Sequence, residues 1–177
     1  DTYTTLVNPH RSLPEAVHRL TGITQKELQQ APPFAAIAAE VEAFIGRAPL
    51  VGHNVAFDAG FLAQKGVGLE STTYDTWDLA FILLPQRRVY SLGPLAASLG
   101  IVHPRPHRAL EDAQVTQRLF VALLELARGM DPGILAELRR LASQGQWPMG
   151  HLLAQVEALG AQHPAGRRSG VGPGGVD

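Results

Sequence analysis

HNVAFD, at residues 53–58, is typical of the end of a strand followed at once by a helix. Asn54 is a favoured residue type for a helix N-cap, and the apolar spacing predicts a helix over roughly 55–64. Asp58 then lies one turn inside that helix, on a face whose other residues are apolar. A carboxylate on such a face is costly unless it is paired or binds a cation, so Asp58 needs a partner.

A second stretch, HRALED at residues 107–112, repeats the arrangement of a His just before a helix and an Asp inside it. Unpaired N–H groups at helix N-termini attract anions, and carboxylates beside them can hold Mg²⁺ together with a substrate phosphate. For Asp112 the structural alternative is an ion pair with Arg108, worth ~0.3–0.5 kcal/mol at a surface. Taken alone, each Asp is equally well explained by a structural role. The pair of stretches favours a metal site.

The composition excludes several other classes of function. The chain has 177 residues, a net charge of −1 and no Cys, so disulfides, thiolate metal sites and a cysteine nucleophile are excluded. The near-neutral balance argues against nucleic-acid binding by bulk charge alone. No stretch reaches the ~18 apolar residues of a membrane span, and the N-terminus has no signal segment. We therefore expect a cytoplasmic α/β protein without a membrane partner.

The order of elements predicts three segments. Strands expected at 2–7, 49–53 and 72–76 alternate with helices and predict an α/β domain over residues 1–128. A small helical extension follows over 129–159. The Gly-, Pro- and Arg-rich segment at 160–177 is expected to be a disordered tail or linker.

The stretches HNVAFDAGFL and HRALEDA resemble the second and third motifs of the DnaQ-like 3′→5′ exonucleases, the DEDD group with a His in its last motif. LVNPHRSLPEAVHRLTGIT, YDTWDLAFILLP and YSLGPLAASLGI are similar to the segments around those motifs, so the resemblance covers roughly residues 1–128. It implies a ribonuclease H-like fold, a mixed sheet flanked by helices. LAELRRLASQGQWP resembles the segment that comes after this domain in a fusion with a DinG-type helicase, and a polymerase fusion is the other context considered.

The resemblance also implies an activity and a site. Members of the family release nucleoside monophosphates from nucleic-acid 3′ ends, with DNA the favoured substrate. Four carboxylates hold two Mg²⁺ or Mn²⁺ ions, of which one activates a water and the other steadies the leaving 3′-oxygen. Asp58 and Asp112 correspond to metal ligands, and His107 corresponds to the general base. An ordinary His titrates near pH ~6.5, which suits that role.

Six further residues are candidates for substrate binding, each with a structural alternative: Gly22, Ile23, Thr24, His53, Asn54 and Phe57. The first three resemble the family's stretch near the terminal nucleotide, or are a helix stop and cap. His53 lines the site, or is satisfied by backbone. Asn54 is most simply an N-cap. Phe57 stacks on a base, or packs in the core.

The family's first motif, Asp-x-Glu followed by Thr-Gly, is not found in the chain. We therefore expect an internal piece of a longer protein that lacks the first strands of the fold and half of the metal site. Such a chain should bind metal weakly and cleave little or nothing. One alternative is a nuclease-dead nucleic-acid-binding module. Another, a different metal phosphohydrolase, would require His ligands at a suitable spacing, and no such spacing is evident.

Other polar residues are predicted to be structural. Asp75 and Asp78 suit turn and cap roles better than a place at the mouth of the site. Arg87 and Arg88 are equally consistent with phosphate contacts and with a solvated loop. His103 has no spacing to other ligands that indicates a metal site.

Overall fold

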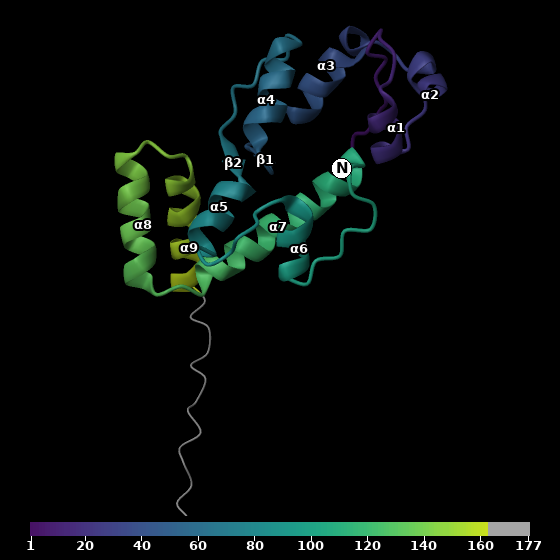
Figure 1. The fold of residues 1–177 in the computed structure, drawn as a ribbon. Coiled ribbons are helices and arrows are strands. Elements are labelled where there is room, and N and C mark those ends of the chain that lie inside the picture. Colours follow the sequence, from purple (N-terminus) through teal and green to yellow (C-terminus); the bar gives the residue numbers. More distant parts are fainter. Residues whose placement is uncertain (163–177) are drawn as a thin grey trace, which may run out of the picture. The chain divides into compact units, whose positions relative to one another are not determined.

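The computed structural model describes residues 1–162 of the chain, and residues 163–177 lie outside the described part (Figure 1). The elements, in order, are α1 (Glu15–Thr21), α2 (Gln25–Gln30), α3 (Phe34–Ile45), β1 (Leu50–Gly52), α4 (Val55–Gln64), β2 (Thr73–Asp75), α5 (Thr76–Leu83), α6 (Leu92–Ser98), α7 (Ala109–Arg128), α8 (Pro132–Gln144) and α9 (Met149–Gln162). They form two compact units, one over residues 1–126 and one from residue 127 onward. Helix α9 includes residues 160–162 of the expected tail, and the rest of that expected tail lies outside the described residues.

A small parallel sheet forms the centre of the βαβ unit that carries the first His–Asp stretch. β1 pairs with β2 in the register Leu50 to Thr73, Val51 to Tyr74 and Gly52 to Asp75. Helix α4 connects the two strands, as a parallel pair requires. The helix-rich α/β arrangement agrees with the ribonuclease H-like fold. The sheet of the described residues is parallel rather than mixed.

The strand expected at residues 2–7 is not formed. The segment carries no regular strand pairing, and a single parallel bridge joins Asn8 to Pro33. The Asn8 N–H donates to the Pro32 carbonyl at 2.9 Å, but Pro33 has no N–H with which to continue the ladder. β-branched residues favour an extended backbone, whereas a strand also needs a neighbour that pairs with it.

Helices α5, α6 and α7 supply much of the buried core of the first unit. Leu79, Leu95 and Leu119 have at most 1% of their surface exposed. Close approach is enforced at Gly52, where an added Cβ would lie 2.8 Å from the Val55 side chain. The last residue of β1 and the first of α4 are therefore held in tight contact at the point where the site begins.

The unit from residue 127 onward contains a helical hairpin of α8 and α9. Asp131 caps α8 by accepting from the Gly133 N–H at 2.8 Å, and Pro132 occupies the first turn, as the sequence predicts. The helices bury Leu135 and Leu153 among other apolar residues. Across the described residues, no helix combines the length and apolarity needed to cross a membrane.

Candidate active site

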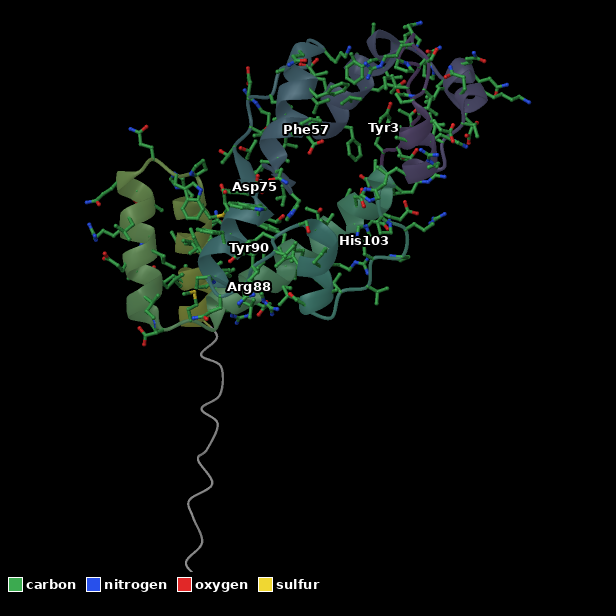
Figure 2. The ribbon with its side chains drawn as sticks, viewed as in Figure 1. Tyr3, Phe57, Asp75, Arg88, Tyr90 and His103 are labelled. Atoms are coloured by element: carbon green, nitrogen blue, oxygen red, sulfur yellow. The ribbon has the colours of Figure 1, made fainter. Side chains whose placement is uncertain are left out.

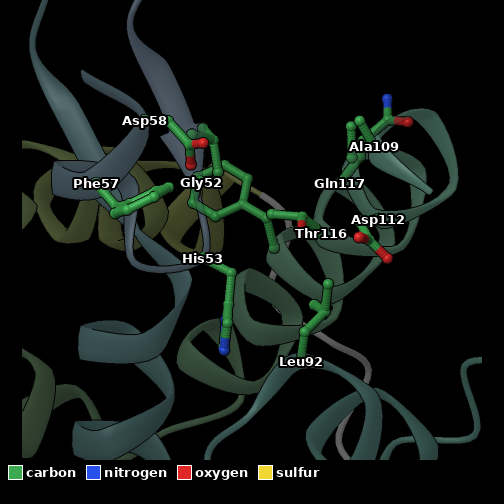
Figure 3. A pocket seen from close by; sticks show the side chains of 12 residues that line it. Gly52, His53, Phe57, Asp58, Leu92, Ala109, Asp112, Thr116 and Gln117 are labelled. Carbon is green, nitrogen blue, oxygen red and sulfur yellow. The ribbon is translucent and has the colours of Figure 1, made fainter. Parts of the chain in front are cut away.

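A pocket of about 590 Å³ is lined by the end of β1 and by residues of α4, α6 and α7. Both motif carboxylates, Asp58 and Asp112, are among the lining residues. Figure 3 shows them on facing walls, Asp58 from α4 beside Phe57 and Asp112 from α7 beside Thr116. The two His–Asp stretches, 54 residues apart in the sequence, therefore contribute to one site, because Asp58 and Asp112 differ by that number.

Asp75 holds the N-termini of two helices at once. Its carboxylate accepts from the Asn54 N–H at 3.0 Å and the Val55 N–H at 2.9 Å, at the start of α4. It also accepts from the Trp77 N–H at 2.8 Å, at the start of α5. The predicted cap role of Asp75 is confirmed for α5. Asn54 occupies the N-cap position in the left-handed conformation but makes no side-chain cap bond, so its predicted capping is wrong.

Asp58 is exposed, and no side chain of residues 1–159 pairs with it. Partial desolvation raises the pKa of Asp58 above its ordinary 3.8, and the nearby negative charge of Asp75 raises that pKa further, while its own backbone N–H acts in the opposite direction. Among the described residues, the groups around Asp58 therefore disfavour its ionised form relative to water. A bound cation would stabilise the ionised form of such a carboxylate.

Asp112 is partnered by His103 rather than by Arg108. The His103 Nε2 lies 2.7 Å from Asp112 Oδ1, and the His107 backbone N–H donates to the same oxygen at 3.2 Å. The side chain of His103 is 10% exposed and that of Asp112 is 33% exposed. Arg108 instead lies near Gly22, where an added Cβ would be 3.4 Å from its Nη2. Sequence reasoning missed His103 because a His in a Pro-rich loop carries no periodic signal.

His107 ends the loop before α7 with its side chain exposed. Its φ of 69° is unusual for a residue other than Gly, and the hydrogen bond from its N–H to Asp112 supports that conformation. His107 is not among the residues that line the pocket, but this bond ties its backbone to a lining carboxylate. The general-base candidate is thus anchored by its backbone next to one metal-ligand candidate.

His53 lines the pocket and makes its hydrogen bond away from both carboxylates. Its Nδ1 is 2.9 Å from Thr76 Oγ1, and Thr76 Oγ1 donates to the Gly52 carbonyl at 3.1 Å. Since the single hydroxyl hydrogen of Thr76 goes to Gly52, His53 donates from Nδ1, and its buried Nε2 has no hydrogen-bond partner in the part of the chain that the structure describes. Burial lowers the pKa of His53, while the Tyr90 backbone and the Asp75 charge act in the opposite direction.

Phe57 is 79% exposed on the wall of the pocket, so the alternative of core packing is wrong. Its ring face is open to stacking. Phe61, one turn along α4, is 47% exposed and makes an edge contact with Phe34, with centroids 5.9 Å apart.

The stretch from Gly22 to Thr24 does not line the pocket, and its local conformation has a structural explanation. Gly22 ends α1 with φ 67°, and Thr24 caps α2 in a reciprocal capping box with Glu27. The carbonyl of Ile23 lies 2.6 Å from His18 Nδ1. A contact of these residues with substrate stays a prediction.

The donor chemistry of the pocket suits a hard divalent cation, because Mg²⁺ and Mn²⁺ prefer carboxylate oxygens, water and phosphate. Among residues 1–162 no group of three or more His, Asp or Glu side chains is placed to hold a metal ion. The site therefore offers carboxylates from two walls and leaves the remaining ligands to water, to phosphate or to other protein groups.

Comparison with known proteins places the chain among nucleases. The family model described as Exonuclease (RNase_T) matches residues 1–120. The chain is 36% identical over 152 residues to the 3′-5′ exonuclease DinG of Bacillus subtilis (strain 168), covering 83% of this chain and 16% of that protein. It is 35% identical over 130 residues to the DNA polymerase III PolC-type of Bacillus cereus, covering 71% of this chain and 9% of that protein.

A similar match is found to the 3′-5′ exonuclease DinG of Staphylococcus aureus (strain USA300), 32% identical over 81% of this chain and 17% of that protein. The chain therefore spans less than a fifth of the length of these relatives. The matched residues include both stretches whose Asp residues line the pocket. The chain belongs to the Exonuclease (RNase_T) family of nucleases.

Proposed function

We propose that the pocket is part of a metal-dependent 3′→5′ exonuclease site that releases nucleoside monophosphates from DNA 3′ ends. The observation that carries this proposal is the presence of Asp58 and Asp112, from separate motifs, on the walls of one pocket. The names of the DinG and PolC-type relatives, an exonuclease and a DNA polymerase, support DNA over RNA. A cytoplasmic location and a helicase or polymerase partner in the same polypeptide are part of this proposal.

Each residue has a role that its surroundings allow. Asp58 and Asp112 hold Mg²⁺ or Mn²⁺, which when bound neutralises phosphate charge and makes a water more acidic. His107 takes the proton of the attacking water through its exposed ring. Phe57 stacks on the terminal base, and His53 and Asn54 border the nucleotide. Gly22, Ile23 and Thr24 contact the terminal nucleotide, and Arg108 lies near Gly22.

The chain by itself should be a weak enzyme. Its 177 residues contain no Asp-x-Glu, so the family's other two carboxylates are not among them. Mg²⁺ held by only two carboxylates keeps most of its waters and is bound loosely. We propose that this chain alone binds divalent metal weakly and cleaves little or no DNA.

A nuclease-dead binding module is the second candidate function. It is favoured by the finding that no three His, Asp or Glu side chains of residues 1–162 are grouped closely enough to hold a metal ion. Both functions predict DNA binding. They differ in whether the protein in the cell supplies an Asp-x-Glu beside Asp58 and Asp112.

Metal binding tests the site directly. Mn²⁺ titration followed by electron paramagnetic resonance should give a Kd on the order of millimolar for the chain. Asp58→Asn and Asp112→Asn should each weaken binding about tenfold or more, whereas Glu70→Gln, a change at an 83% exposed side chain, is the matched control. Equal binding by all four proteins would refute the assignment of the two Asp residues.

Sequencing the coding DNA upstream of Asp1 separates the two functions. An in-frame Asp-x-Glu-x-Thr-Gly predicts that the longer protein degrades a labelled single strand from its 3′ end with Mg²⁺, and that His107→Ala greatly slows it. A start codon close to Asp1 with no such motif would favour the binding module instead.

A further inference from the structure

Three aromatic rings form a cluster between α5 and the loop that precedes α6. The rings of Trp77 and Phe81 are stacked with centroids 5.4 Å apart and an interplanar angle of 5°. Tyr90 leans against both, at 5.7 Å from Trp77 and 5.4 Å from Phe81. The Tyr90 hydroxyl donates to the Leu84 carbonyl at 2.8 Å, which fixes the loop. The three rings are therefore in mutual contact, and the loop is tied back to the end of α5.

The cluster is only partly used for packing. Phe81 is 52% exposed and Val89, in the adjoining loop, is 54% exposed. A ring whose sole role was to anchor the loop would be expected to turn its face inward. Half of the Phe81 surface is instead available to a ligand.

Positive charge is concentrated in the same segment. Arg87 and Arg88 lie in the loop with exposed side chains, and neither forms an ion pair with any residue in the described part of the chain. Residues 84–91, which form this loop, contain two Arg and no Asp or Glu, although the whole chain has a net charge of −1. The loop therefore has a local excess of cations, which is the charge that a polyanion requires.

The cluster is connected to the pocket through the backbone. Leu92, two residues after Tyr90, lines the pocket. His53 also lines the pocket and bonds Thr76, the residue before Trp77. In the view of Figure 2, Asp75, Tyr90 and Arg88 follow one another along this side of the first unit.

We propose that Trp77, Phe81 and Tyr90, together with Arg87 and Arg88, form a platform that binds the single-stranded DNA leading to the pocket. Bases stack on aromatic faces in a sequence-tolerant way, and Arg side chains track the phosphates. The proposal rests on the proposed function, because it takes the pocket as the place where the 3′ end is received. It adds a binding surface outside the pocket for the nucleotides that precede that end.

Tryptophan fluorescence tests the platform without catalysis. Trp147→Phe leaves Trp77 as the single Trp, since the chain has two. An oligothymidylate of about fifteen nucleotides, added in the presence of a metal chelator, should quench this signal with saturation. Phe81→Ala in the same background should weaken binding about tenfold, and an unchanged circular dichroism spectrum shows that the fold is kept.

Salt dependence tests the arginines. Arg87→Ala with Arg88→Ala should lower affinity about tenfold or more at about 50 mM salt and reduce the slope of log K against log salt by about 1.4, or 0.7 for each lost phosphate contact. The matched control is Arg47→Ala with Arg140→Ala, which removes the same charge from side chains paired with Glu70 and Glu137. The control should bind as the parent does.

The outcomes separate this proposal from the active-site proposal. In one outcome the oligonucleotide quenches Trp77 fluorescence equally in the parent and in the Asp58→Asn and Asp112→Asn variants, while the parent binds no Mn²⁺. That outcome would support the platform and refute the metal site. Mn²⁺ binding in a chain whose Trp77 signal is unaffected by the oligonucleotide would refute the platform. Equal loss of affinity in the Arg87/Arg88 and Arg47/Arg140 variants would also refute it, because the effect would be one of net charge.

Discussion

The two His–Asp stretches share their spacing, but the burial and hydrogen bonding of their His and Asp residues are reversed. In residues 53–58 the His is half-buried and hydrogen-bonded to Thr76, while the Asp is exposed and has no side-chain partner among residues 1–159. In residues 107–112 the His is exposed, while the Asp is partly buried and takes part in two hydrogen bonds. The same spacing therefore presents one bare carboxylate and one restrained carboxylate to a single pocket.

The difference has a physical cause in the surroundings of each helix start. At α4 the Asn54 and Val55 N–H groups donate to Asp75 rather than to Asp58. At α7 the preceding loop brings His103 and the His107 N–H onto Asp112. A shared motif does not imply a shared electrostatic environment, because Asp75 and His103, which differ between the two helix starts, come from outside the motif.

The largest decrease in the free energy of unfolding should come from Asp75→Ala. This substitution removes hydrogen bonds at the first His–Asp stretch and leaves those of the second stretch in place. Three N–H groups at two helix starts would lose a charged acceptor, and we expect a loss of about 2–4 kcal/mol in the free energy of unfolding. Urea unfolding measures this loss, and Asp75→Asn, which keeps one acceptor oxygen, should lose less. A loss below about 0.5 kcal/mol for the Ala variant would show that the shared cap is unimportant.

His103→Ala, which removes a hydrogen bond at the second His–Asp stretch, should lower the free energy of unfolding by a smaller amount. Asp112 would keep only the His107 N–H, and the loss of one charge-assisted bond predicts a decrease of about 1–2 kcal/mol. Thermal unfolding of this variant beside His10→Ala, an exposed His, provides the comparison. Identical melting curves for the two variants would contradict the pairing of His103 with Asp112.

The free energy of unfolding, measured as a function of pH, should show the contribution of His53 in the first stretch. Because burial lowers its pKa below the ordinary 6.5, the folded state binds this proton less well than the unfolded state does. The His53 contribution is present above pH ~6.5 and is lost as the pH falls through the lowered pKa, by less than about 1.4 kcal/mol per pH unit. His53→Gln should flatten that part of the profile, and a parallel profile would argue against a buried neutral His.

Asp58→Asn should have the smallest effect on stability, and it should stabilise the protein, whereas Asp75→Ala and His103→Ala destabilise it. The raised pKa of Asp58 means that ionisation disfavours the folded state, so its contribution is present below the unfolded pKa and is lost as pH rises through the folded pKa. The Asn variant should therefore melt on the order of 1 °C higher at neutral pH and equally at about pH 3. A lower Tm at neutral pH would indicate that Asp58 has a partner in the protein.

The local elements could be predicted well from the residues. The strand after Pro49 and the helix over 55–64 are explained by the apolar spacing, as is the long helix ending at Arg128. Motif resemblance led to both carboxylates of the pocket. The long-range partners could not be found in this way, because the Asp75 bonds to α4 and the His103 bond to Asp112 join segments whose approach is set by the tertiary fold. The exposure of Phe57 likewise depends on the packing around α4.

The double cap at Asp75 also has a consequence for local opening. One carboxylate serves amide groups that are up to 23 residues apart, at Asn54 and Trp77, so the start of α4 and the start of α5 cannot unravel independently without leaving a charge unsatisfied. Hydrogen exchange at the amides of Asn54, Val55 and Trp77 should therefore report one cooperative opening event. The bare carboxylate of Asp58 is carried by a helix whose first turn opens only together with its neighbour.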